Sequence, residues 1–146
     1  MYYHEEKMDL LKVPRGYAIA HCISADFALG AGVAKQINDV YEMRRQLRCL
    51  YAAYDDWDTS DWVGACLLCM DVMNLVTKER YFHKPTLETL RSALEDMKKV
   101  CEEYRIHKVA MPQIGCGLDR LNWNDVKPMI QSVFADTDIE IMVCFL

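Results

Sequence analysis

Runs of strand-forming residues alternate with helical patterns along this chain. Short apolar or alternating runs, bounded by glycine, serine or charged residues, predict strands at 2–7, 17–23, 64–69, 72–78, 108–112 and 139–146. The first of these, "YYHEEK", predicts a short edge strand. Only Met70-Asp71 separates the third strand from the fourth, which predicts a hairpin even though this dipeptide is unfavourable in a two-residue turn.

The clearest helix lies in the second half of the chain and follows Pro85-Thr86. Its apolar residues recur at alternating spacings of three and four, at Leu87, Leu90, Leu94, Met97, Cys101 and Tyr104. A glycine-rich entry predicts another helix at 30–40, and the helical pattern continues after a break at 41–54.

A last helix is expected near the C-terminus. Asn124 can cap it, and it would run to Phe134 with Pro128 tolerated because it lies in the first turn. The segment 54–62, "YDDWDTSDW", is polar, acidic and aromatic, and predicts an exposed loop.

The order of these elements is β, β, α, α, β, β, α, β, α, β. It predicts one α/β domain over 1–146, a three-layer α/β/α arrangement around a mixed six-stranded sheet. Ligands of such sheets bind beyond the carboxyl ends of the strands. Three loops with unusual chemistry follow strands, at 24–34, 77–86 and 112–121, so we expect them to form a single site.

Composition narrows the class of protein. The chain has 146 residues, 52% of them hydrophobic, without a run of membrane-spanning length, and its start lacks the apolar region of a signal peptide. We therefore expect a soluble, cytoplasmic monomer. The formal charge of −5 argues against a protein that coats nucleic acid non-specifically, but not against one phosphorylated small molecule held by backbone amides.

Seven cysteines raise the question of disulfides or metal. Most lie in apolar runs, and their number is odd, which favours small buried thiols in a reducing compartment. Cys66 and Cys69 form a CxxC, but on a strand these positions face opposite sides of the sheet, and no second pair completes a zinc site. We predict neither a metal nor a cofactor.

Two glycine-rich loops are candidate phosphate cradles. Gly30-Ala31-Gly32 leads directly into a helix, whose free N–H groups and positive dipole end can face an anion; a closely packed turn is the alternative. In "IGCGLDRL", Gly115 and Gly117 allow a positive φ or a close approach of the backbone to a ligand.

Two side chains in these loops are candidate nucleophiles. Cys116 would need an adjacent base, and the candidates, His21 and His83, are not paired with it locally, so a small spacer between glycines is favoured. Lys78 stands where an apolar strand ends. There it is either a solvated lysine or a partly desolvated amine that can form a Schiff base.

Four motifs together carry a resemblance to a known family. "AHCISADFALGAGVA", "LVTKER", "HKPT" and "MPQIGCGLDRLNW" resemble the macrodomain family, which binds ADP-ribose, and within it a branch of ADP-ribosyl glycohydrolases. The resemblance runs from about Lys7 to the C-terminus. It implies an enzyme that removes ADP-ribose from acidic side chains of proteins and deacylates O-acyl-ADP-ribose.

The resemblance also implies residue roles. Lys78 matches the lysine that attacks C1″ of the distal ribose, and Asp119 matches the aspartate that resolves the adduct. The implied ligand-binding residues are Asp9, Leu10, His21, Ser24, Gly30, Ala31, Gly32, Val33, Ala34, Thr77, Pro112, Ile114, Gly115, Cys116, Gly117, Leu118 and Phe145. Among them Asp9 would contact the adenine amino group, Phe145 would lie beside the adenine, and Ser24 would line the ribose pocket.

Some features depart from the family pattern. Met8 precedes Asp9 where the family usually has glycine, and segment 41–63 does not follow the relatives closely. Three other functions stay open: a non-catalytic ADP-ribose reader, a hydrolase of ADP-ribosylated thymidine in DNA, and a phosphatase acting on ADP-ribose-1″-phosphate. The short basic patch Arg44, Arg45 and Arg48 keeps a DNA substrate open despite the negative charge.

Overall fold

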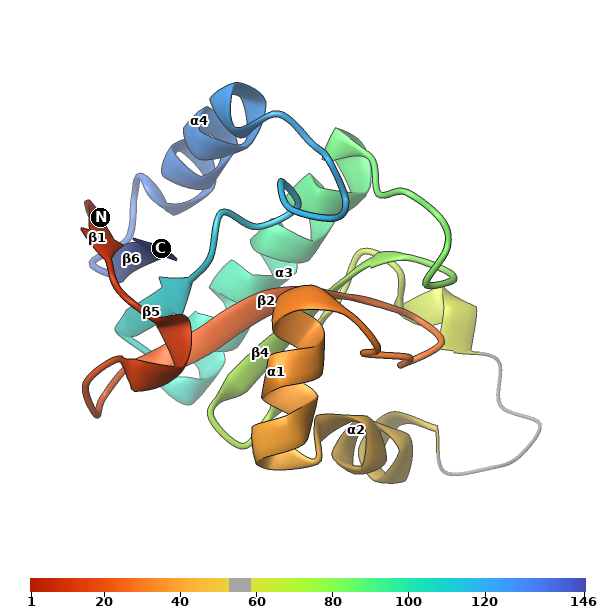
Figure 1. Cartoon of the computed structure of the whole chain (residues 1–146). Helices are drawn as coiled ribbons and strands as arrows, with labels where there is room; N and C mark the ends of the chain where they lie inside the picture. Colours follow the sequence, from red (N-terminus) through yellow and green to blue (C-terminus); the bar gives the residue numbers. More distant parts are fainter. Residues whose placement is uncertain (53–58) are drawn as a thin grey trace.

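A computed structural model describes residues 1–52 and 59–146 (Figure 1). The strands are β1 (Tyr2–Lys7), β2 (Ala18–Ser24), β3 (Cys66–Cys69), β4 (Val72–Lys78), β5 (Lys108–Met111) and β6 (Glu140–Phe145). The helices are α1 (Gly32–Tyr41), α2 (Met43–Tyr51), α3 (Leu87–Tyr104) and α4 (Trp123–Phe134), with short 3-10 helices η1 (Leu10–Lys12) and η2 (Thr59–Trp62). The predicted order of strands and α-helices is confirmed over the described residues.

The strands form one mixed sheet in the order β1-β6-β5-β2-β4-β3. Neighbouring strands are parallel throughout, except for the antiparallel pair β3–β4. The carboxyl ends of the five parallel strands therefore lie along the same edge, and the loops after β5, β2 and β4 are adjacent there. This topology is what brings the three predicted loops together.

Helices cover both faces of the sheet, which confirms the three-layer prediction. Helices α3 and α4 pack on one face, and α1 and α2 pack on the other (Figure 1). Cys66 belongs to the core under α3 and α4, whereas Cys69 belongs to the core under α1 and α2, so the two thiols face opposite sides as predicted. Across the described residues, no group of three or more His, Cys, Asp or Glu side chains is placed to hold a metal ion.

The hairpin between β3 and β4 is confirmed. Cys69 pairs with Val72, so Met70-Asp71 is the whole connection. Met70 has a φ of 57°, in the left-handed region where glycine or asparagine is usual, and its side chain is exposed. Pairing of two apolar strands therefore determines this turn more than its own residues do.

Several predicted boundaries need correction. Helix α4 begins at Trp123 and its cap is Asn122, whose side chain accepts a hydrogen bond from the backbone of Asn124 at 2.9 Å. Asn124 is therefore inside the first turn, and Pro128 lies in the second. Pro128 is exposed, so the carbonyl group that it leaves without an N–H partner can be solvated.

The other boundary differences are small. Strand β6 ends at Phe145, one residue before the chain end. The break before α2 is confirmed at Glu42, whose φ is 52°, and α2 ends at Tyr51. Of the predicted 54–62 loop, 54–58 lies outside the described residues, and the remainder forms η2. Within the described part of the chain, no helix combines the length and the apolar content needed to cross a membrane.

Candidate active site

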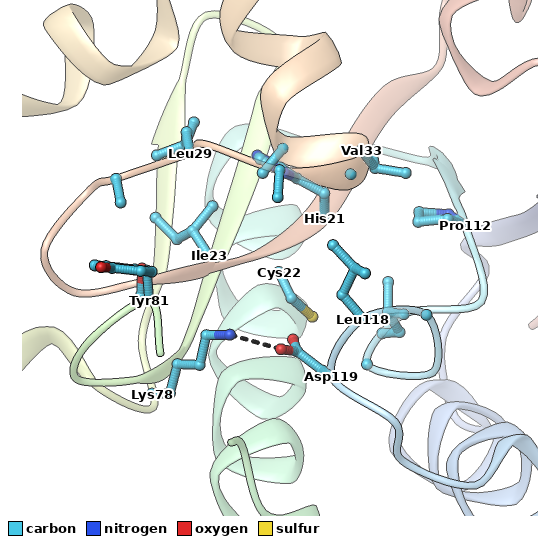
Figure 2. A pocket seen from close by; sticks show the side chains of 18 of the residues that line it. His21, Cys22, Ile23, Leu29, Val33, Lys78, Tyr81, Pro112, Leu118 and Asp119 are labelled. Atoms are coloured by element: carbon cyan, nitrogen blue, oxygen red, sulfur yellow. Dashed lines mark hydrogen bonds and ion pairs between the residues drawn. The ribbon is translucent and has the colours of Figure 1, made fainter. Parts of the chain in front are cut away.

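A cavity of about 780 Å³ opens at the carboxyl ends of β2, β4 and β5 (Figure 2). All three predicted loops contribute to its wall. It is lined by His21, Cys22, Ile23, Ser24, Ala28, Leu29, Gly30, Ala31, Gly32, Val33, Ala34, Lys78, Tyr81, Lys84, Pro112, Gln113, Ile114, Gly115, Gly117, Leu118 and Asp119. This volume lies within the range of small-molecule binding sites.

Lys78 and Asp119 form an ion pair inside the cavity. Lys78 is the last residue of β4, and its Nζ lies 2.6 Å from Oδ1 of Asp119, which belongs to the loop after β5 (Figure 2). The two side chains are only 13% and 16% exposed. Lys78 is therefore a partly desolvated amine with a proton acceptor in direct contact, and the alternative of a solvated lysine is ruled out.

Cys22, which lines the cavity, and Cys116, in the loop after β5, are both protonated thiols. Burial, and next the negative charge of Asp119, raise the pKa of Cys22 to about 12, and Figure 2 shows its sulfur beside Asp119. Burial raises the pKa of Cys116 to about 11, and its Sγ donates to the carbonyl group of Ile114 at 3.3 Å. Because a thiolate is the reactive form, the spacer interpretation of Cys116 is favoured over a nucleophile.

The glycine loops face each other across the cavity. Gly32 has a φ of 59°, and a methyl group added there would lie 3.2 Å from Cδ1 of Leu118. Gly115 has a φ of 73°, and a methyl group there would lie 2.9 Å from Leu121. Both positions thus require glycine. Gly30 and Gly117 do not have a positive φ, and a methyl group would be in ordinary contact with the carbonyl oxygen of Ala28 at Gly30 and in open space at Gly117.

The start of α1 is directed at this cavity. Gly32, Val33 and Ala34 form its first turn and line the cavity wall. The first N–H groups of a helix have no intrahelical partner, and the helix dipole is positive at this end. The arrangement suits an anionic ligand group such as a phosphate.

Asp26 ties two of the three loops together. Its carboxylate accepts hydrogen bonds from Oγ of Ser24 at 2.5 Å and from the backbone N–H groups of Ala28 at 3.1 Å and Tyr81 at 2.8 Å. Burial alone would raise its pKa, but these hydrogen bonds hold the pKa below its ordinary value. Sequence reasoning missed this residue, although an aspartate two residues after a strand end is typical of such turns.

The structure places most of the predicted binding residues on the cavity wall. The exceptions are Asp9, Leu10, Thr77, Cys116 and Phe145. Thr77 is buried and, by strand alternation, faces the α3 side of β4. Cys116 is half-buried behind its glycines.

Asp9, Leu10 and Phe145 gather beyond β1 and β6, further along the same sheet edge. The backbone N–H of Met8 bonds the carbonyl group of Phe145 at 2.9 Å. The side chain of Asp9 accepts from the backbone of Leu11 at 3.0 Å and so caps η1. Leu10 is buried in the core under α1, while Phe145 is partly exposed.

Seven lining residues were not predicted as site residues: Cys22, Ile23, Ala28, Leu29, Tyr81, Lys84 and Gln113. The sequence offered a reason to consider two of them, because Lys84 lies in the motif "HKPT" and Tyr81 follows Lys78 by three positions. Lys84 donates from Nζ to the carbonyl group of Leu118 at 2.9 Å. This bond and the Lys78–Asp119 pair both join the loop after β4 to the loop after β5.

A comparison with models of known protein families identifies the family of this chain. Residues 20–130 match the family model described as "Macro domain". The chain belongs to the macrodomain family. The matched stretch contains most of β2, the whole of β3, β4 and β5, and all three loops of the cavity, so the predicted family and fold are confirmed.

Two relatives and one solved structure illustrate what this macrodomain is similar to. It is 40% identical over 144 residues to human ADP-ribose glycohydrolase OARD1, covering 94% of this chain and 87% of the relative. It is 32% identical over 60 residues to the DNA ADP-ribosyl glycohydrolase of Thermus aquaticus, covering 41% of this chain and 17% of that protein. The solved macrodomain of Thermus aquaticus DarG has the same fold, with a TM-score of 0.80, 21% identity and coverage of 99% and 98%.

A buried histidine supports the floor of the site in this macrodomain. His21 is 1% exposed, and its Nε2 lies 2.5 Å from Oδ1 of Asn74 on β4. Nδ2 of Asn74 donates to the carbonyl group of Leu67, so Oδ1 is free to accept from the histidine. Burial lowers the pKa of His21 to about 4, which keeps its ring neutral at pH 7.

We expect His21 to make this macrodomain sensitive to acid. Since its pKa is near 6.5 in the unfolded chain and about 4 in the folded one, the unfolded state binds more protons between these values. Stability is therefore lost as the pH falls from 6.5 to 4, by about 3 kcal/mol for this group. Urea unfolding of wild type and H21Q at pH 7 and pH 4 measures the effect. The free energy of unfolding of wild type minus that of H21Q should be about 3 kcal/mol smaller at pH 4 than at pH 7.

A matched control is available at an exposed histidine. The side chain of His107 is 63% exposed, so H107Q should leave the loss of stability between pH 7 and pH 4 as large as in wild type. Equal losses in wild type and H21Q would contradict the assignment to His21.

Proposed function

We propose that this macrodomain is an ADP-ribosyl hydrolase, which cleaves the bond between C1″ of the distal ribose and the group attached to it. The proposed substrates are ADP-ribose esters of acidic protein side chains and O-acyl-ADP-ribose. The observation that carries the proposal is the Lys78–Asp119 pair, a nucleophile and a proton acceptor 2.6 Å apart in a cavity of ligand size. The 40% identity to an ADP-ribose glycohydrolase supports it.

The proposed ligand lies along the carboxyl edge of the sheet. Its adenine end would occupy the region of Asp9 and Phe145, beyond β1 and β6. Its pyrophosphate would bind the start of α1 and the loop at Gly115, whose backbone can donate hydrogen bonds. Its distal ribose would then lie beside Ser24 and Lys78, at the ends of β2 and β4.

The same pair would carry out both halves of the reaction. An ammonium is not a nucleophile, so Lys78 first passes a proton to Asp119. Nζ then bonds to C1″, and the carboxylate leaves with the electron pair of the broken C–O bond and takes up the proton from Asp119, which is ionised again. Ring opening converts the adduct into a Schiff base, to which water adds after it gives a proton to Asp119. Breakage of the C–N bond releases ADP-ribose and restores Lys78.

The alternatives are less well supported by this geometry. A reader needs only the cavity, whereas this chain has both the amine and the carboxylate in contact. A phosphatase acting on ADP-ribose-1″-phosphate would break the P–O bond, and Lys78 would then form no bond to C1″. For the compartment we keep the cytoplasm as our proposal, since the seven cysteines are all free and a reducing environment preserves free thiols.

Product analysis tests the proposal directly. Wild type is incubated in parallel with a glutamate-ADP-ribosylated protein, with O-acyl-ADP-ribose and with ADP-ribose-1″-phosphate. Free ADP-ribose should appear from the first two. Binding of ADP-ribose without release from either of them would identify a reader, and phosphate release from the third alone would identify a phosphatase.

A further inference from the structure

A set of hydrogen bonds on one carboxylate fixes the direction of the Ser24 hydroxyl. Ser24 is the last residue of β2, is 5% exposed and lines the cavity. Its Oγ donates to Oδ1 of Asp26 at 2.5 Å. The same carboxylate accepts from the backbone N–H groups of Ala28 at 3.1 Å and of Tyr81 at 2.8 Å. Three donors from two loops of the site therefore converge on Asp26.

The Asp26 carboxylate is ionised at neutral pH. Burial alone would raise the pKa of Asp26, but the three hydrogen bonds, together with the positive charge of Arg80, hold this pKa below its ordinary value. An ionised carboxylate has no proton to give and can only accept hydrogen bonds. The single hydroxyl proton of Ser24 therefore lies in the bond to Asp26, and the serine oxygen presents only lone pairs to the cavity.

This polarity determines which kind of ligand group can bind Ser24. Phosphate and carbonyl oxygens are acceptors, so they cannot form a hydrogen bond with a serine oxygen whose proton is already engaged. A hydroxyl group of a ligand can donate to that oxygen. The carboxylate behind Ser24 strengthens such a bond, because hydrogen bonds in a chain polarise one another. The pyrophosphate is thus excluded from Ser24, and a sugar hydroxyl is favoured.

Ser24 lies directly beside the residue that is proposed to attack C1″. Ser24 and Lys78 are register partners on the neighbouring strands β2 and β4, whose backbones are about 4.8 Å apart. The pairing continues past the strand ends, because the N–H of Ala25 donates to the carbonyl group of Lys78 at 2.8 Å and that of Asp26 donates to Glu79 at 3.1 Å. With C1″ at Lys78, the nearest sugar hydroxyl is the one on the adjacent carbon, the 2″ hydroxyl.

We propose that Asp26 is a positioning residue for the distal ribose, because it holds the Ser24 hydroxyl as an acceptor for the 2″ hydroxyl of the ligand. The inference rests on the proposed hydrolase function, which puts C1″ at Lys78. Asp26 is not part of the cavity wall and acts through Ser24. Its bond to the N–H of Tyr81 also ties this acceptor to the loop that follows Lys78.

Calorimetric titration of the intact chain with ADP-ribose, 2″-deoxy-ADP-ribose and 3″-deoxy-ADP-ribose tests the inference. The measured quantity is the Kd of each deoxy ligand divided by the Kd of ADP-ribose. For the 2″-deoxy ligand this ratio should be about 10 to 100 in wild type. It should fall to about one in S24A, which lacks the acceptor oxygen. For the 3″-deoxy ligand the ratio should be the same in wild type and in every variant.

Two variants test the role of Asp26 itself. In D26N one of the two terminal atoms is a donor, so the side chain cannot accept all three hydrogen bonds, and the 2″-deoxy ratio should fall below about three. D26S keeps a hydroxyl that can accept from Ala28 in the turn, and its ratio should fall in the same way. S24A/D26N should have the ratio of S24A, because Asp26 acts through the serine hydroxyl.

The matched control is an exposed aspartate on α1. Asp39 is 60% exposed and pairs with Lys35, and D39N should leave both ratios at their wild-type values. A purely structural role of Asp26 would weaken the binding of all three ligands alike. Wild-type ratios in D26N and D26S would therefore overturn the inference.

The outcomes separate this inference from the hydrolase function itself. If wild type binds ADP-ribose and 2″-deoxy-ADP-ribose equally well, or if the 3″-deoxy ratio responds to S24A instead, the inference is wrong and the hydrolase stands. If wild type neither binds ADP-ribose nor releases it from a glutamate-ADP-ribosylated protein, the hydrolase proposal itself fails.

Discussion

Replacing Lys78 with alanine is expected to lower the kcat for release of ADP-ribose by at least about a thousandfold. The variant lacks the amine that bonds to C1″, and no other described lysine contacts Asp119. Affinity for ADP-ribose should change less than tenfold, because the glycine loops that would hold the pyrophosphate are untouched. Single-turnover kinetics with a glutamate-ADP-ribosylated peptide, together with calorimetric titration of ADP-ribose, measures both quantities.

A lysine far from the cavity provides the control for this experiment. Lys99 is exposed on α3, and K99A should keep the wild-type kcat. A K78A variant whose kcat stays within tenfold of wild type would remove Lys78 from the mechanism. A variant that loses ADP-ribose binding as well would show that the ion pair holds the cavity in shape.

Replacing Asp119 with asparagine is expected to trap the reaction half-way. Asparagine has the same shape but cannot take a proton, so in this variant Lys78 must lose its proton to solvent, and the adduct forms slowly. Once formed, the Schiff base has no base beside it to activate water, so it should persist. We expect turnover to fall by about 100- to 10,000-fold. Borohydride reduction should then fix an adduct on Lys78, seen in the intact mass as one ADP-ribose less one water, plus two hydrogens.

The matched control is an exposed aspartate. Asp138 is 86% exposed beyond α4, and D138N should turn over like wild type without an adduct. Combining D119N with K78A should abolish the adduct, because the attacking amine is then absent. Near-normal turnover of D119N would mean that Asp119 only pairs with Lys78 and does not transfer protons.

Much of the fold followed from local pattern. The apolar spacing of α3, the strands on either side of Met70-Asp71 and the opposite orientation of Cys66 and Cys69 all depend on the period of a helix or strand, which neighbouring residues determine. The start of α4 was misplaced because Asn122 and Asn124 are both good caps. Which of them caps the helix depends on the path of the preceding loop, which sets the residue at which the helix begins.

The sequence by itself determined the class of fold, the family and the three loops that carry chemistry, because periodicity and motifs are local properties. Only the tertiary structure decided that Lys78 meets Asp119, 41 residues away, at 2.6 Å and away from bulk water. It also showed Asp26 joining two loops and the rings of Tyr81 and Phe82 left exposed beside the cavity. Parallel strands β2, β4 and β5 bring these loops to one edge, and the burial, charge and contacts of a side chain depend on neighbours that are distant in the chain.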